Sequence, residues 1–214
     1  DLHSFPTRRS SDLHIAPYLL AIASFVLLLS AVTTFLYFEQ LRLVSETFAD
    51  VEERTRVFAR LDWIVQSLTI GVQLFITGRI ASRLGLTVLL TLVPLAMIGG
   101  FVALAASGAF SVLAVVFVLR RAGEYALVRP GREMLFSRLD NETKYKAKNF
   151  IDVAVYRGSD WISGQVKTGL DGSGITPAAV ALIGAALAGV WALNGLWLGR
   201  RAAGPLPRAS PALR

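Results

Sequence analysis

The sequence predicts an all-α membrane protein with six transmembrane helices, and composition and run length are the first evidence. Hydrophobic residues make up 54% of the 214 residues and charged residues only 17%. The mean hydropathy of +0.54 is higher than an ordinary soluble domain shows. Apolar runs of about 18 to 22 residues recur, and this length crosses about 30 Å of hydrocarbon. The lipid bilayer is therefore the expected environment.

Composition also excludes several kinds of chemistry. The chain has no cysteine, so it offers no disulfide, thiolate metal site or cysteine nucleophile. Its two histidines, His3 and His14, lie at the N-terminus and assemble no metal or catalytic set. No P-loop occurs. We therefore expect no enzyme activity, metal or cofactor, and we assign the net charge of +7 to inner loops, with no nucleic-acid partner.

The first thirteen residues are expected not to belong to the protein. The stretch from His3 to Leu13, HSFPTRRSSDL, resembles a translated sequencing adapter and has no apolar region that could serve as a signal peptide. The alternative is a genuine basic, Ser-rich arm. We divide the chain into this segment (1–13), a six-helix transmembrane unit that forms a C-terminal half (14–200) and a cytoplasmic tail (201–214).

Four spans follow directly from hydropathy. In order they are Pro17–Phe38, Trp63–Ile80, Leu84–Ala106 and Pro177–Leu198. The polar segment Glu39–Asp62 separates the first two and is expected to be a solvated amphipathic helix or a loop. The last span is rich in small residues, and Gly184, Ala188 and Gly195 suit close contact between helices.

Two further helices are interrupted by charges. Phe110–Val128 is apolar until it reaches Arg120, Arg121 and Glu124. The other helix, Asn149–Leu170, contains Asp152, Arg157 and Asp160. Charged side chains inside a membrane are costly unless they face water, a partner or a substrate. These two helices are therefore expected to border the interior of the bundle or a cavity.

Charge and loop patterns orient the spans. With His14 on the cytoplasmic side, the inner connections (79–83, 129–148 and the tail) hold more than twice as many basic residues as the outer ones. This predicts a multi-pass protein of a bacterial inner membrane with a cytoplasmic C-terminus. The connection Gly78–Gly85 resembles the G-x-x-x-D-R-x-G loop of major facilitator transporters, with Ser82 in place of the aspartate. Six helices would be one half of such a twelve-helix bundle, and the N-terminal half would be a partner.

The charged residues of the interrupted helices form the candidate site. In one interpretation Arg120, Arg121 and Arg157 attract an anionic small molecule, and carboxylates act in gating or coupling. The three carboxylates are Glu124, Asp152 and Asp160. The alternative is a purely structural network of buried ion pairs. Arg120 and Glu124 are spaced i, i+4 and can pair along one helix face.

The stretch from Tyr125 to Val153 resembles the nucleotide (ATP/ADP) translocases of plastids and intracellular bacteria and their broader bacterial relatives. These proteins typically show Y-x-L-x-D-P-x-K-E-M, four residues, L-D, then T-K-x-K-G-K and I-D-V. The matching residues are Tyr125, Leu127, Pro130, Glu133, Met134, Leu139, Asp140, Thr143, Lys144, Lys146, Lys148, Ile151, Asp152 and Val153. The resemblance implies a membrane antiporter of about twelve helices, with Lys148 among its substrate-binding residues.

Three departures from this pattern leave the substrate open. Glu124 stands where the family usually has lysine, Arg129 where it has aspartate, and Asp160 near another family lysine. A polyphosphate site needs surplus positive charge, which acidic residues reduce.

We therefore expect the C-terminal half of a secondary transporter that moves an anionic metabolite by alternating access, with nucleotide exchange as one candidate activity. Arg120, Arg121, Arg157 and Lys148 would bind the anion, and Asp152 would orient or couple it. One alternative is an exporter, or a proton-coupled carrier, of another organic anion. Another is a membrane scaffold that transports nothing.

Overall fold

The computed structural model is all-helical over the residues that it describes, and four of its helices are long and apolar enough to cross a membrane. The described residues are 8–137, 139, 141–151, 153, 158, 162, 165–166, 169 and 174–204. The four candidate spans are Ala16–Thr47, Val51–Arg83, Gly85–Ser107 and Pro177–Ala202. They confirm the four spans that hydropathy predicts. The predicted helix over 149–170 lies largely outside the described residues, so the six-helix half-bundle stays a prediction.

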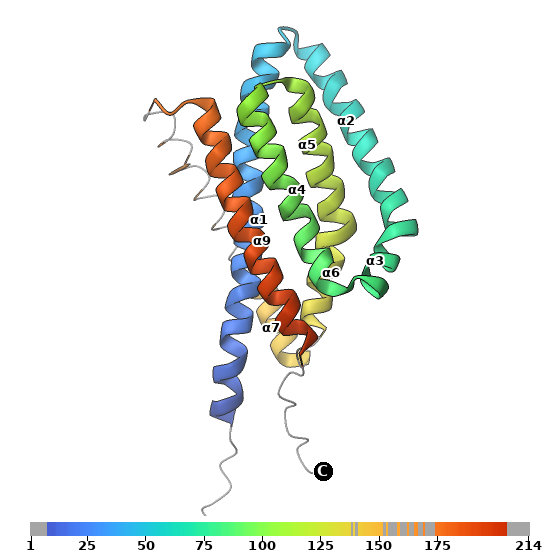
Figure 1. The fold of residues 1–214 in the computed structure, drawn as a ribbon, viewed down its shortest axis with the longest axis vertical. Coiled ribbons are helices and arrows are strands. Elements are labelled where there is room, and N and C mark those ends of the chain that lie inside the picture. Colours follow the sequence, from blue (N-terminus) through green and yellow to red (C-terminus); the bar gives the residue numbers. More distant parts are fainter. Residues whose placement is uncertain are drawn as a thin grey trace, which may run out of the picture.

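Ten helical elements are described, and Figure 1 shows their arrangement. In chain order they are α1 (Arg8–Thr47), α2 (Val51–Val72), the π-helix η1 (Gln73–Thr77), α3 (Gly78–Arg83), α4 (Gly85–Ser107), α5 (Phe110–Gly123), the π-helix η2 (Glu124–Val128), α6 (Arg129–Phe136), α7 (Asn141–Phe150) and α9 (Pro177–Ala203). Helix α5 continues through η2 into α6 without a break. The predicted helix over 110–128 is therefore confirmed, and it extends further than predicted.

Helices α1 and α2 are also longer than their apolar spans. Nearly all of the polar segment 39–62 is helical, with a connection of only three residues, 48–50. The reason is local pairing: Arg42 binds Glu39 at 2.7 Å and Glu46 at 3.0 Å, one turn away on either side. Of the two predicted alternatives, the helix is the correct one. Helix α1 also takes in residues 8–13, which lie within the segment excluded from the fold prediction.

The apolar core lies between α1, α4 and α9, which run side by side in Figure 1. Trp191 of α9 is fully buried, and its ring centroid lies 5.6 Å from that of Phe25 in α1. Glycine is required where α9 meets α4, since a Cβ at Gly195 would stand 2.9 Å from the carbonyl oxygen of Leu90. The predicted close contact of small residues in this helix is confirmed.

Helix α2 lies at the edge of the molecule and packs mainly on α5, away from α9 (Figure 1). At one end of this pair, the rings of Phe48 and Phe110 meet edge to face with centroids 4.9 Å apart. Most of the outward surface of α2 is exposed, including Trp63 at 73% and Leu74 at 73%. Because α2 has one packed side only, its other sides are available to lipid, water or another protein.

The predicted inner loop over 129–148 is wrong in one respect. The structure has α6 and α7 in this region, separated by a short connection at 137–140. Pro130 is compatible with helix here because it lies in the first turn of α6, directly after η2. The shorter connection Gly78–Gly85 is likewise helical over Gly78–Arg83, and the chain turns only at Leu84 and Gly85, where Gly85 has a left-handed φ of 76°, which favours glycine.

Candidate functional site

Two adjacent arginines at the end of α5 reach two different helices. Consecutive residues of an α-helix point about 100° apart, so Arg120 and Arg121 cannot share a partner face. Arg120 points into the bundle, where it is only 7% exposed. Its Nη1 donates to Thr33 Oγ1 of α1 at 2.9 Å and to Glu124 Oε2 at 2.8 Å. One guanidinium thus joins α1 to the α5–η2 junction.

Arg121 faces the other way, toward α2. Its Nη1 forms an ion pair with Asp62 of α2, and its guanidinium carbon lies 5.3 Å from the ring centroid of Phe117. The side chain of Arg121 is 26% exposed and that of Asp62 is 54% exposed. This second ion pair is therefore partly exposed at the surface of the described structure, in contrast to the Arg120–Glu124 pair.

Both arginines lie well inside the apolar zone of the fold. Helix α4 carries no charge over its 23 residues and ends at Ser107, beside the start of α5. Ten uncharged residues of α5 then precede Arg120, which corresponds to about 15 Å of helix, or half of a hydrocarbon core of about 30 Å. A charge at such a depth costs about 2.5–3.5 kcal/mol on insertion scales. The ion pairs and hydrogen bonds of the two arginines offset this cost.

Arg129 and Glu124 face each other across η2. Arg129 Nη2 lies 3.8 Å from Glu124 Oε1, and its guanidinium carbon lies 4.2 Å from the ring centroid of Tyr125. The π-helix explains the contact, because a wider turn brings positions five apart onto one side of the helix. The negative charge of Glu124 is therefore shared between Arg120 and Arg129.

Pro130 accounts for a second link between the α2 and α5 parts of the chain, this time between η1 and η2. Pro130 has no N–H to offer to the carbonyl of Ala126, four residues before it. Thr77 Oγ1 of η1 donates to this carbonyl oxygen at 2.8 Å. Gln73 Nε2 of η1 likewise donates to the Tyr125 carbonyl oxygen at 3.0 Å. Side chains of one π-helix thus satisfy the free carbonyls of the other, as membrane interiors require.

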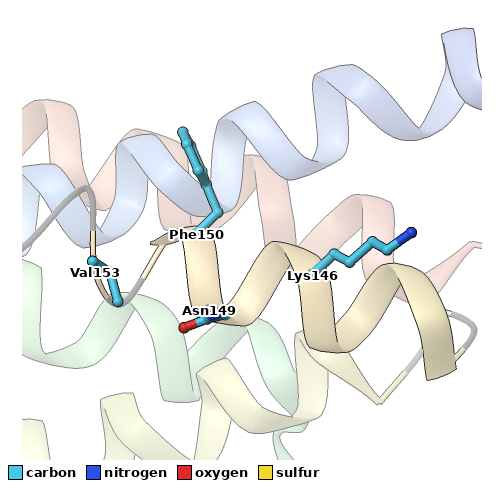
Figure 2. A pocket seen from close by; sticks show the side chains of 4 residues that line it. All are labelled: Lys146, Asn149, Phe150 and Val153. Carbon is cyan, nitrogen blue, oxygen red and sulfur yellow. The ribbon is translucent and has the colours of Figure 1, made fainter.

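Lys148 does not join the arginines. Its Nζ lies 2.8 Å from Glu133 Oε1 and 2.9 Å from Oε2, which ties α7 to α6. A shallow hollow of about 390 Å³ lies near the end of α7 and is lined by Lys146, Asn149, Phe150 and Val153. Figure 2 shows Phe150 and Lys146 pointing away from each other at its rim. None of these four lining residues belongs to the charged set on α5.

The structure therefore brings together three of the seven predicted site residues. Arg120, Arg121 and Glu124 lie within five positions of one helix and are linked to α1 and α2. Three others lie outside the described residues: Asp152, Arg157 and Asp160. Two partners, Thr33 and Asp62, are additions that sequence reasoning missed. Asp62 did carry a signal, as an acidic residue directly before an apolar run.

Comparison with known proteins gives no family assignment: no protein-family model, curated protein or solved structure matches the chain. Fold and site define it as an all-helical protein with four helices able to cross a membrane. Within the described residues, two ion pairs lie in its apolar zone: Arg120–Glu124, which also contacts α1, and Arg121–Asp62, which joins α5 to α2. Any more specific function has to be argued from this geometry.

Proposed function

We propose that the chain is the C-terminal half of a secondary transporter that moves an anionic metabolite across a bacterial inner membrane by alternating access. ATP/ADP-type nucleotide exchange is the first candidate. The observation that carries the proposal is the Arg120–Arg121 pair, two neighbouring guanidinium groups deep in an apolar helical zone. A planar guanidinium binds carboxylate and phosphate through two parallel hydrogen bonds, so the partly exposed Arg121 suits an organic anion, with Arg120 as a fixed positive charge next to it.

The two arginines have different parts in this proposal. Arg120 is buried and bound on two sides, which suits a fixed positive charge. Arg121 is partly exposed, and its present partner is the carboxylate of Asp62. A substrate carboxylate or phosphate has the chemistry to take the place of that carboxylate. The exchange would release a contact between α2 and α5, and anion binding would thereby be linked to helix movement.

The local charge is relevant to the choice of substrate. Three positive groups (Arg120, Arg121 and Arg129) meet two negative ones (Glu124 and Asp62), so this part of the site carries one surplus positive charge. One charge does not neutralise a triphosphate. In the proposed bundle, further cations come from the N-terminal half. The support for that half is the resemblance to the translocases and the six predicted spans, which also place the C-terminus in the cytoplasm.

The test uses the intact gene in a bacterial host that has no nucleotide importer. We expect uptake of radiolabelled ATP above that of the empty host, and we expect Arg121→Gln to lower it at least tenfold at equal membrane levels. Unlabelled citrate and other organic anions serve as competitors. If no anion is taken up although the protein is inserted, the transport proposal is wrong. Uptake of an organic anion other than ATP would reject a nucleotide as the substrate but not the proposal of anion transport.

A further inference from the structure

Helix α2 and the π-helix η1 that continues it have a polar flank. Asp62, Gln66 and Gln73 are spaced i, i+4 and i+11, which places them within about 40° of one another around the helix axis. All three are exposed. Thr69 lies between them on the α5 side, where its buried Oγ1 has no hydrogen-bond partner among the described residues. The polar flank, defined by Asp62, Gln66 and Gln73, borders the seam between α2 and α5.

An apolar face lies next to this flank. Trp63, Ile70 and Leu74 are 73%, 57% and 73% exposed, and they share one side of the helix whose centre lies about 80° from that of the polar flank. Exposed aromatic and aliphatic side chains along a membrane span are what lipid contact requires. The contrast between the two sides is sharp, because Asp62 and Trp63, like Gln73 and Leu74, are neighbours in sequence.

The two sides of α2 cannot face the same medium. An amide that is exposed to hydrocarbon loses its hydrogen bonds with water and gains none in return, so polar side chains of a span face water or protein. Gln73 directs its amide N–H toward the α5–η2 seam, where it reaches the Tyr125 carbonyl oxygen. Asp62 reaches Arg121 across the same seam. The polar flank is therefore continuous with the charged cluster on α5.

We propose that the polar flank of α2 is the water-facing wall of the anion path, and that Asp62 holds Arg121 until an anion displaces it. This inference rests on the proposed function and adds to it the residues of a second helix. Carboxamide N–H groups donate to anionic oxygens, so Gln66 and Gln73 extend the donor surface that starts at Arg121. Asp62 is then a resident competitor of the substrate, and its removal strengthens anion binding.

This chain contains no cysteine, so single cysteine substitutions give a direct test once any cysteines in the rest of the full-length protein are replaced by serine. Gln66→Cys and Gln73→Cys probe the polar flank, and Ile70→Cys and Leu74→Cys are the matched controls on the apolar face. Each full-length variant is treated in membrane vesicles of both orientations with a charged, membrane-impermeant methanethiosulfonate. We expect modification at positions 66 and 73 to be at least tenfold faster than at positions 70 and 74. Equal rates at all four positions would overturn the water-facing wall.

The second arm tests Asp62. ATP, with citrate as a second probe, is expected to slow modification of Gln66→Cys, and adding Asp62→Asn is expected to lower the half-protecting concentration about fivefold. An unchanged or raised concentration in the Asp62→Asn background would overturn the competitor role. If neither anion slows the modification of Gln66→Cys, the proposed function is wrong. The difference in modification rate between the polar flank and the apolar face would still show that the polar flank faces water. The two failures are thus distinguishable.

Discussion

The two sides of the bundle are built on different principles. Where α9 meets α4 and α1, the contacts are apolar and close, with glycines at the narrowest points and Trp191 fully buried. Where α2 meets α5 and η2, the contacts are polar: an ion pair and two hydrogen bonds from side chains to carbonyl oxygens. The apolar side chains of the first interface fit together in a single close-packed arrangement. The polar groups of the second interface can change partners, because water or an anion can replace one member of each pair.

This difference indicates which side moves. A close-packed interface resists gradual deformation, because each shift creates overlap or voids. Hydrogen bonds and partly exposed ion pairs can be broken and remade at low net cost. We therefore place the rigid part of the described bundle in α1, α4 and α9 and the adaptable part in α2. The buried Arg120–Glu124 pair lies between these two parts. We count it with the rigid part because a buried ion pair is costly to break.

The largest expected effect comes from breaking that buried pair. Arg120→Met leaves Glu124 buried with only the longer contact to Arg129, and removal of one partner of a buried pair costs about 3–5 kcal/mol. Thermal unfolding of the purified protein in detergent should show a large loss of stability. The double variant Arg120→Met/Glu124→Leu is expected to regain most of it. If Arg120→Met is as stable as the wild type, the Arg120–Glu124 pair does not stabilise the rigid side of the bundle.

The next effect tests the close contact between α4 and α9. Gly195→Leu forces a side chain against the backbone of Leu90 and should cost about 1–3 kcal/mol. Gly189→Leu, in the same helix, is the control, because nothing lies within 4 Å of a Cβ at that position. Both variants are compared by thermal unfolding and by yield of monodisperse protein. Equal losses of stability in Gly195→Leu and Gly189→Leu would show that glycine at position 195 affects the helix itself and not its contact with α4.

A smaller effect tests the link between the two π-helices. Thr77→Val deprives the Ala126 carbonyl of its donor and should cost about 1 kcal/mol. In a Pro130→Ala background the restored N–H can serve this carbonyl, so the same substitution should then cost much less. A double-mutant cycle measures the coupling. Strict additivity would show that Pro130 does not create the need for this hydrogen bond.

The smallest effect is expected at Lys148. Its pair with Glu133 is about one third to one half exposed, and such pairs contribute about 0–1 kcal/mol. Lys148→Gln should therefore leave stability and anion affinity nearly unchanged. A clear loss of affinity with unchanged stability would return Lys148 to the binding site that the family resemblance implies.

Sequence reasoning was strongest where a single helix determines the outcome. The apolar spans and the turn at Gly85 depend on local composition and backbone preference, and both are confirmed. The pairing of Arg120 with Glu124 also follows from spacing alone.

Contacts between distant segments were out of reach of the sequence. Asp62 and Arg121 are 59 residues apart, and no pattern in either helix predicts that they meet. Pro130 lacks the N–H that a helix residue donates to the carbonyl four residues before it. The chain stays helical there because Thr77 and Gln73, from another helix, bind the carbonyls left free. Which of two alternatives occurs depends on tertiary structure.

The central claim, that the arginines of α5 bind an anion, is tested most directly by ligand-induced stabilisation of the purified full-length protein. A ligand that binds the folded state at concentrations well above its Kd raises the Tm. We predict that ATP or citrate raises the Tm of the wild type and of Lys148→Gln, and that neither raises it in Arg121→Gln. An Arg121→Gln variant that is stabilised by the anion as much as the wild type would contradict this claim.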